Sequence, residues 1–335
     1  MKRTIPTLIV LVALGHSTSS EACSIFTAHD DATVLVGNNE DWYGNYKSIL
    51  WFTPPEDGKY GYVAWGFEEL DHFSQGGMND QGLFWDALAT PALPIENCTG
   101  TQPFTLTTLE ELLQNAATVE EAIEFLEECY YADMLEEAQF MFVDANGDSA
   151  IFEGDQIIYP EDGVDYQIGL NFYWSNPSLG NYPDWRLDVL TAMMEDGLEL
   201  SVDYFAEMAD AAHQGVVSYD GLYTRYTTVS VLGSGEFHLY YNLMWDDPIV
   251  FDLAEEFELG PHEYEMHDLF YGDSDTDSDT DGDTDTDTDV DTDSDSDAGV
   301  DAGVDPGDDG DCGCATAGVV GSSSLLLALM EILSL

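Results

Sequence analysis

Residues 23–42 read CSIFTAHDDATVLVGNNEDW, and this stretch decides the fold. It contains two short runs of β-prone residues, at 23–26 and 33–36, separated by an Asp30-Asp31 pair. Runs rich in β-branched and aromatic residues on either side of a polar turn are typical of a β-hairpin. The sequence therefore predicts an antiparallel hairpin whose first strand begins at the cysteine.

The segment before Cys23 has the layout of a secretory signal. Two basic residues at 2–3 precede an apolar run over 5–14, and small residues occupy positions 20 and 22. The apolar run has about ten residues, whereas a membrane-spanning helix needs roughly 20. We expect cleavage after Ala22, so that residues 1–22 form a signal peptide and the exported protein begins at Cys23. A lipid-modified cysteine is the alternative, although Ser20-Glu21 fits a lipoprotein signal poorly.

An N-terminal cysteine carries a nucleophile and a base on one residue. Its thiol has a reference pKa of about 8.5, and its free α-amine has one of about 7.7 to 8. At neutral pH the amine is partly unprotonated, so it can accept the thiol proton and later return a proton to a leaving amine. Cys23 is therefore a candidate nucleophile for acyl transfer.

Composition and charge limit the class of protein. Of the 335 residues, 44% are hydrophobic, which is enough to bury a core despite a formal net charge of −62. Residues 23–272 hold 48 acidic residues against four basic ones, a formal net charge of −44. Such a body repels polyanions, and nucleic-acid binding normally needs a basic footprint. We therefore exclude nucleic acid as a partner.

Residues 273–311 contain 18 Asp and no basic residue. Self-repulsion and the lack of apolar residues predict a disordered, extended spacer. Asp277, Asp279 and Asp281 resemble the start of an EF-hand loop, but Thr288 stands where such a loop needs a bidentate Glu. We expect diffuse cation condensation there rather than a calcium site.

Residues 312–335 combine a Cys-Gly-Cys motif at Cys312 and Cys314 with a hydrophobic run from 315, which is long enough to span a bilayer. The arrangement resembles the C-terminal sorting tails of bacterial surface proteins, and a plain hydrophobic anchor is the alternative. Either way, we expect the tail to attach the body to a membrane or cell surface outside the cytoplasm.

The remaining pattern predicts an α+β domain over residues 23–272. Thr118 and Glu121 form a capping box at the start of one helix. Cys98 and Cys129 could pair in an oxidising compartment, and two free thiols are the alternative. Strands are expected at Lys59–Gly66, Phe140–Val143, Ala150–Phe152, Val229–Leu232 and Phe237–Met244, and helices at Leu109–Asn115, Val119–Cys129 and Asp184–Met194.

Several motifs occur in a specific order along this domain. They lie at 23–26 (CSIF), 36–42 (VGNNEDW), 75–83 (QGGMNDQGL), 143–153, 170–172, 181–186 and 223–226. In this order the chain resembles the cysteine N-terminal-nucleophile (Ntn) hydrolases of the choloylglycine hydrolase, penicillin V acylase and acyl-coenzyme A:isopenicillin N acyltransferase superfamily. The resemblance covers nearly all of residues 23–260. It implies a four-layer αββα sandwich and hydrolysis of linear, non-peptide amide C–N bonds.

The resemblance also implies roles for single residues. Cys23 matches the nucleophile that forms an acyl thioester, and Asp41 matches the acid that holds its α-amine. Asn171 matches the donor to the oxyanion, and Arg225 matches the arginine that supports the thiolate. Arg225 is also one of only two arginines in an acidic body, which makes a functional role plausible on charge alone.

This chain departs from the family pattern in two places. Asn38-Asn39 stands where family members usually have Arg-Asn, so one cation near the nucleophile is missing. The position that holds an oxyanion-binding Asn or Tyr falls near Ala89, which leaves a backbone N–H as the donor. We expect Asn39 and Ala89 to line the substrate and oxyanion site, and Arg186 to be structural, paired with nearby carboxylates.

The substrate is expected to be a small amide, such as an N-acyl amine or a penicillin V-like or bile-salt-like compound. The shortage of cations argues against strongly anionic amides and favours neutral or cationic ones. The histidines show no ligand spacing, and we predict neither a metal nor a cofactor. Two other functions stay open, an N-acyltransferase that uses the same thioester and a non-catalytic surface lipoprotein or binding module.

Overall fold

The computed structural model describes residues 23–272, apart from 71, 93–101, 104, 106, 128–129, 132–137, 155 and 181. The predicted signal peptide and the whole tail from 273 lie outside the described residues, as do both cysteines of the predicted disulfide. Contacts divide the chain into the units Met1–Ser274 and Asp275–Leu335, and every described residue belongs to the first.

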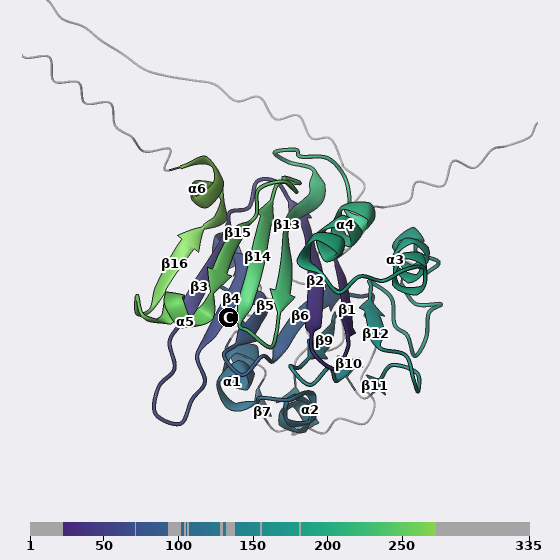
Figure 1. The fold of residues 1–335 in the computed structure, drawn as a ribbon, viewed down its shortest axis with the longest axis horizontal. Coiled ribbons are helices and arrows are strands. Elements are labelled where there is room, and N and C mark those ends of the chain that lie inside the picture. Colours follow the sequence, from purple (N-terminus) through teal and green to yellow (C-terminus); the bar gives the residue numbers. More distant parts are fainter. Residues whose placement is uncertain are drawn as a thin grey trace, which may run out of the picture. The chain divides into compact units, whose positions relative to one another are not determined.

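Two antiparallel sheets form the centre of this unit (Figure 1). The first has six strands in the order β12-β1-β2-β13-β14-β15, and the second has eight in the order β11-β10-β9-β6-β5-β4-β3-β16. The first sheet consists of β1 (Ser24–His29), β2 (Val34–Tyr43), β12 (Tyr166–Gly169), β13 (Leu222–Val231), β14 (Glu236–Tyr241) and β15 (Ile249–Asp252). The second consists of β3 (Ser48–Thr53), β4 (Tyr62–Phe67), β5 (Ser74–Asn79), β6 (Phe84–Ala89), β9 (Ala138–Val143), β10 (Ser149–Phe152), β11 (Ile157–Ile158) and β16 (His262–Glu265). A short parallel pair joins β7 (Gln102–Pro103) to β8 (Tyr130–Tyr131).

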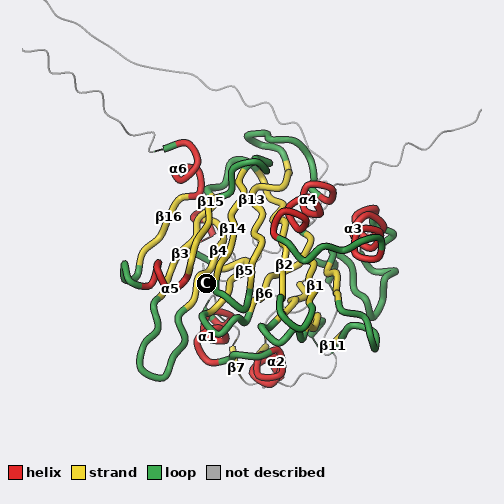
Figure 2. The backbone as a smooth tube through the Cα atoms, in the orientation of Figure 1, coloured by secondary structure: helices red, strands yellow, loops and turns green. Residues whose placement is uncertain are grey.

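Helices cover both sheets. α1 (Thr108–Asn115) and α2 (Val119–Glu127) pack on strands of the eight-stranded sheet, whereas α3 (Trp185–Glu195) and α4 (Val202–Ala212) pack on strands of the six-stranded sheet. Figure 2 shows these helices as short segments beside a fold dominated by strands. Two shorter helices, α5 (Leu253–Phe257) and α6 (Met266–Tyr271), accompany the last strands. The order helix, sheet, sheet, helix confirms the predicted αββα sandwich.

Aromatic rings fill the space between the two sheets. Phe52 of β3 lies with its ring centroid 6.4 Å from that of Phe237 on β14 and 5.6 Å from that of Phe251 on β15. Trp65 of β4 lies 6.0 Å from Phe237. These four side chains are buried, so the inner faces of the sheets are held together largely by the removal of aromatic surface from water.

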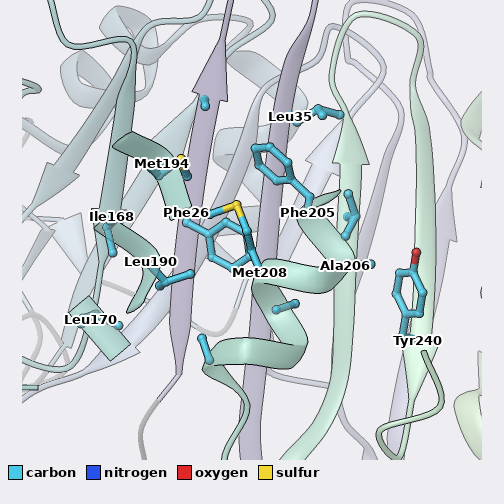
Figure 3. Close-up of a cluster of buried hydrophobic side chains, with 14 of the residues drawn as sticks. Phe26, Leu35, Ile168, Leu170, Leu190, Met194, Phe205, Ala206, Met208 and Tyr240 are labelled. Carbon is cyan, nitrogen blue, oxygen red and sulfur yellow. The ribbon is translucent and has the colours of Figure 1, made fainter. Parts of the chain in front are cut away.

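A second core lies between the six-stranded sheet and its helices. Figure 3 shows Phe26 of β1 beneath Phe205 and Met208 of α4, with Leu190 of α3 beside them. The rings of Phe26 and Phe205 are 5.6 Å apart. A Cβ atom at Gly37 would lie 2.4 Å from the Phe26 ring, so glycine at this position of β2 makes room for that ring.

Most of the predicted elements are present. β1 and β2 form the predicted hairpin, and β9 and β10 form the second one. α1 and α3 lie within one residue of their predicted bounds, with Asp184 as the N-cap of α3. α2 begins at Val119 as predicted, and its predicted end at Cys129 lies outside the described residues. β14 ends at Tyr241, before the predicted Met244, because Asn242 and Leu243 adopt positive φ angles of 51° and 60°.

The main difference from prediction concerns β2. The expected strand covers 33–36, but β2 continues to Tyr43, so the polar run 38–41 lies inside the strand rather than at its end. Both faces of the strand are covered at this point, and the polar side chains there find partners on other elements. Within the described ranges, no helix has the length and apolar content needed to cross a membrane.

Candidate active site

The first sheet aligns several polar residues across its strands. Glu40 of β2 pairs with Tyr226 of β13, and Ser24 of β1 pairs with Asn39. Continuing the β1 register by one residue places Cys23 opposite Glu40. Residues that face each other across an antiparallel sheet point to the same side. Cys23, Glu40 and Tyr226 therefore form a row, which we call the Cys23 row. Asn171 follows the end of β12 by two residues, and Arg186 binds both its side chain and the Cys23 carbonyl.

Cys23 is buried at 5% exposure, and it is a free cysteine. Burial is the main reason that the pKa of its thiol lies well above the usual value, and the nearby carboxylates of Glu40, Asp41 and Asp86 raise the pKa further. A hydrogen bond from the backbone of Asp41 acts in the opposite direction. These surroundings disfavour a free thiolate at Cys23, so attack by the sulfur requires a base that accepts the thiol proton.

Asp41 lies one residue beyond the Cys23 row. Its Oδ1 accepts a hydrogen bond from the Thr224 hydroxyl of β13, and its Oδ2 lies 3.7 Å from Nη1 of Arg186. Burial raises the pKa of the Asp41 carboxyl to about 7, and Arg186 and Thr224 offset this effect only in part. Asp41 can therefore gain or lose a proton near neutral pH.

Arg186 connects the predicted site residues to one another. It lies on the first turn of α3 with 1% exposure, and its Nη1 donates to the backbone carbonyl of Cys23 at 2.9 Å. Its Nη2 donates to Oδ1 of Asn171 at 3.0 Å and to Oδ2 of Asp184 at 2.6 Å. The predicted pairing with carboxylates is confirmed for Asp184 and Asp41. The contacts with Cys23 and Asn171 were not predicted.

Asn171 is held by hydrogen bonds at both ends of its amide. Its Oδ1 accepts from Arg186, and its Nδ2 donates to the carbonyl oxygen of Ala89 at 2.9 Å. The structure thus brings Asn171 and Ala89 together, and Arg186 joins Asn171 to the backbone of Cys23. An amide nitrogen carries two hydrogens, and the bond to Ala89 uses one of them. Donation to an oxyanion remains a prediction for these two residues.

The side chain of Asn39 lies on the other face of β2 from the Cys23 row. The Asn39 amide donates to the carbonyl of Ala209 on α4 at 2.9 Å and accepts from the Thr227 hydroxyl at 2.6 Å. Since neighbouring residues on a strand point to opposite faces, Asn39 points to the helix layer and Glu40 to the space between the sheets. The structure therefore does not bring the Asn39 side chain to the sulfur.

Arg225 sits in a bulge of β13, where Thr224 pairs with Asp41 and Tyr226 pairs with Glu40. Its guanidinium donates to the carbonyl of Tyr43 and, at 3.3 Å, to the hydroxyl of Tyr241. Its charge lowers the pKa of the buried Tyr226 hydroxyl, although burial and nearby acids still raise that pKa well above its usual value. The hydrogen bonds of Arg225 thus go to Tyr43 and Tyr241, and its support of a thiolate at Cys23 remains a prediction.

Asp86 of β6 reaches across from the second sheet, and sequence reasoning missed it. Its Oδ2 accepts hydrogen bonds from Nδ2 of Asn38 at 2.8 Å and from Nε1 of Trp65 at 2.9 Å. A Cβ atom at Gly76 would lie 2.0 Å from this oxygen, so glycine is needed there for Asp86 and Trp65 to meet. The available signal was an acid within the apolar run 83–89, where a strand pattern leaves no place for a charge.

Among the residues that the structure describes, one group of side chains outside this site could hold a metal ion. Ligand atoms of Glu265, His267 and Asp268 lie within 4.8 Å of one another on β16 and α6. Lys47 already forms an ion pair with Glu265 at 3.4 Å, and His267 lies 3.3 Å from Asp268. β16 is an edge strand of the eight-stranded sheet, so this group does not belong to the Cys23 row.

Comparisons with known proteins identify the fold. No protein-family model and no curated protein matches the chain. Among solved structures, a mutant of conjugated bile acid hydrolase from Clostridium perfringens is similar over 72% of this chain and 96% of that chain, with a TM-score of 0.51 and 15% identity. This likeness shows that the chain has the Ntn-hydrolase sandwich fold.

Two further structures match at lower TM-scores. Penicillin V acylase from Agrobacterium tumefaciens is 18% identical over 70% of this chain and 87% of that chain, with a TM-score of 0.43. An ortholog of N-acylethanolamine-hydrolyzing acid amidase from Caenorhabditis elegans is 16% identical over 63% and 93%, with a TM-score of 0.46.

Proposed function

We propose that residues 23–272 form an amidohydrolase that cleaves a linear, non-peptide C–N amide bond through an acyl thioester on Cys23. One observation carries this proposal. Arg186 donates to the backbone carbonyl of Cys23 and to the side chain of Asn171, and it lies 3.7 Å from Asp41. Three residues assigned to one reaction from separate motifs are thus linked by a single buried cation.

The reaction begins with removal of the peptide bond before Cys23, which frees the α-amine. This amine takes the thiol proton as the sulfur attacks the substrate carbonyl, and the resulting ammonium returns a proton to the departing amine. Water then attacks the thioester with help from the same amine, which releases the carboxylic acid and restores the thiol. A base on the same residue suits a thiol whose pKa is raised, because the proton leaves only as the new bond forms.

Asp41 and Arg186 would hold the nucleophile for these steps. The carboxyl of Asp41 interacts with the freed amine, and its pKa of about 7 allows it to balance the charge of the ammonium when that forms. Arg186 fixes the backbone of Cys23 through the carbonyl. Both residues position the reacting group and are buried.

Asn171 would bind the oxyanion of the tetrahedral intermediate. Arg186 and Ala89 fix both ends of its amide, so the free Nδ2 hydrogen has a defined direction. A preorganised donor of this kind is typically worth about 3 kcal/mol to the transition state. The Ala89 carbonyl accepts from Asn171 and cannot donate. The second candidate donor to the oxyanion is a backbone N–H near Ala89.

The substrate we propose is an N-acyl amine without a strong negative charge. The three acids nearest the thiol raise its pKa, which means that the site already opposes negative charge. An anionic amide would add to that repulsion in a buried setting, where charges interact strongly. Neutral or cationic amides avoid this penalty.

A matched substrate series tests the function. The mature protein should hydrolyse N-acyl amines whose amine part is neutral or cationic, and should act at least about tenfold less well on a taurine conjugate with the same acyl chain. Cys23→Ala should abolish turnover. It should change the unfolding midpoint by no more than an ordinary surface substitution does. Mass spectrometry of the N-terminus must show an unmodified Cys23.

Three results would contradict the proposal. They are a lipidated or absent Cys23, full activity in Cys23→Ala, and no turnover by a mature protein that begins at Cys23. Added acceptor amines show whether the thioester is resolved by transfer instead of hydrolysis, because transfer yields a new amide.

A further inference from the structure

A side chain of the eight-stranded sheet holds the backbone on both sides of Asn171. Gln139 of β9 is buried, and its Nε2 donates to the carbonyl of Leu170 and, at 3.1 Å, to the carbonyl of Phe172. An amide nitrogen has two hydrogens, so one glutamine can bind both carbonyls at the same time. Asn171 follows β12 of the six-stranded sheet, so these bonds cross from one sheet to the other.

Asn171 is the central residue of a three-residue turn. The backbone N–H of Phe172 donates to the carbonyl of Leu170 at 2.9 Å, which is a common arrangement at the end of a strand. This turn has one hydrogen bond of its own, and Gln139 binds the carbonyls of its first and last residues. The backbone of the turn sets the direction in which the Asn171 side chain leaves the chain. Gln139 therefore helps to fix that direction.

Two more side chains of the eight-stranded sheet's layer bind the residues that follow. The Thr90 hydroxyl, just beyond β6, donates to the Tyr173 hydroxyl at 2.7 Å. Glu153, just beyond β10, accepts from the backbone N–H groups of Trp174 at 2.5 Å and Ser175 at 3.2 Å. These contacts hold the chain after the turn, whereas Gln139 is the one that binds the turn itself.

The chemistry of position 139 requires a double donor. Carbonyl oxygens only accept hydrogen bonds, so a carboxylate of the same shape could not replace the Gln139 amide. No described residue donates to the other end of this amide, Oε1. Burying an amide is costly unless it is hydrogen-bonded, and an apolar side chain would avoid that cost in a strand that is buried throughout. What the amide contributes here is the pair of bonds to the turn.

We propose that Gln139 is a positioning residue for the oxyanion site, which acts by fixing the turn at 170–172 so that the Asn171 amide points in one direction. This proposal rests on the proposed function of Asn171 as the oxyanion donor. Both Gln139 hydrogen bonds that the structure records go to backbone carbonyls, so its effect on the reaction passes through Asn171.

Two glutamine variants test the role in the reaction. Gln139→Met keeps the size of the side chain and removes both donors. Gln167→Met is the matched control, because Nε2 of Gln167 on β12 also donates to a backbone carbonyl, that of Ile158 at 2.8 Å, away from the turn. We expect Gln139→Met to lower kcat roughly tenfold and to leave KM within about twofold, because only the transition state carries an oxyanion. Gln167→Met should change neither by more than about twofold.

A background without the Asn171 amide separates positioning from a general effect on the fold. In Asn171→Ala, the additional change Gln139→Met should lower the remaining kcat by less than about twofold, because no amide is left to position. A residue that acts only on stability would lower kcat by the same factor in both backgrounds. That result would overturn the action of Gln139 through Asn171.

Hydrogen exchange tests the turn without any substrate. Backbone amides in peptides that cover 170–175 should exchange roughly tenfold faster in Gln139→Met than in wild type, and Gln167→Met should leave them unchanged. If Gln139→Met fails to fold, Gln139→Asn serves for both measurements, because its amide is one methylene shorter and cannot bind both carbonyls. Unchanged exchange in the folded Gln139 variants would overturn the assignment of Gln139 as the residue that fixes the turn.

The outcomes distinguish the two proposals. If wild type hydrolyses no amide, the proposed function fails, and the role of Gln139 in the reaction fails with it. The exchange of 170–175 then still decides whether Gln139 fixes the turn. If wild type hydrolyses an amide and Gln139→Met has the kcat of wild type, the proposed function stands and the positioning role of Gln139 is overturned.

Discussion

Arg186 binds more of the predicted site residues than its position in the sequence would indicate. One guanidinium pairs with Asp184 and Asp41 and binds the Cys23 carbonyl and the Asn171 amide. Burying this cation is favourable only because so many acceptors surround it. In turn, the charge of Arg186 lowers the pKa of the buried Asp41 carboxyl.

Replacing Arg186 by Met should lower the free energy of unfolding by roughly 3 to 5 kcal/mol, because it leaves buried carboxylates without their cation. Denaturant unfolding measures this change. Lys47→Met is the control, since Lys47 pairs with Glu68 at an exposed site and its removal should change stability far less than the removal of Arg186. Equal, small effects of the two substitutions would show that Arg186 is not the cation that holds the site together.

Asp41 should make stability depend on pH. Its pKa rises from 3.8 when unfolded to about 7 when folded, so the neutral form favours the folded state. This contribution is fully present below the unfolded pKa and is lost as the pH rises through about 7, a change on the order of a few kcal/mol. Asp86 contributes with the same sign.

Asp41→Asn stays neutral at every pH, so its thermal midpoint should fall less than that of wild type between about pH 5 and about pH 8. Asp30→Asn, at an exposed turn, is the control and should follow wild type. If Asp41→Asn and wild type show the same pH dependence, Asp41 is already ionised at the acidic end.

At the scale of elements, the Met78-Asn79 motif explains how α1 is attached to the second sheet. The Asn79 Nδ2 donates to the carbonyls of Leu113 and Ala116 at the end of α1, each at 2.7 Å. Its Oδ1 accepts from the backbone of Leu83 at 2.9 Å, across the turn between β5 and β6. One buried amide therefore satisfies the end of a helix and a strand connection together.

Asn79→Ala should lower the free energy of unfolding by about 3 kcal/mol, because it leaves several buried backbone groups without partners. Asn115→Ala is a matched control at an exposed position of the same helix, and it should change stability by less than about 0.5 kcal/mol. Equal effects of the two substitutions would show that water replaces the Asn79 bonds.

The elements that the sequence predicts well are those with a local signal. Turn residues identify the hairpins, and the Thr118 hydroxyl accepts from the Glu121 backbone at 3.2 Å as its capping pattern indicates. The continuation of β2 through 38–41 has no such signal, because those polar residues are stabilised by partners from α3, α4 and β6. Arg186 and Asp86 were missed as site residues for the same reason, since their partners lie far away in the sequence.

At the scale of the whole molecule, charge is the dominant property. The described body contains most of the 48 acids of residues 23–272 and little positive charge to compensate them. The acids near Cys23 are buried and interact specifically, whereas the majority repel one another across the surface. Such self-repulsion destabilises a compact state and is screened by salt.

Sodium chloride should therefore raise the thermal midpoint of the protein, with most of the increase below about 0.5 M, where the Debye length falls below the spacing of surface charges. Sucrose at matched osmolality is the control, because it does not screen charge. A midpoint that is independent of salt, or that responds equally to sucrose, would mean that repulsion among these acids is negligible in the folded state.

The register of β1 determines what an inexact version of the predicted cleavage before Cys23 would do to the fold. The ladder begins at Ser24, so a chain trimmed one residue early or one residue late would still build both sheets. The early product would keep an amide in place of the amine, and the late product would begin with a serine whose side chain lies on the helix side of the sheet. The early product keeps the Cys23 carbonyl that Arg186 binds, whereas the late product loses it. If Cys23 is the nucleophile, as we propose, the early product would be folded but inactive, and specific activity per folded molecule would report the fidelity of the cleavage.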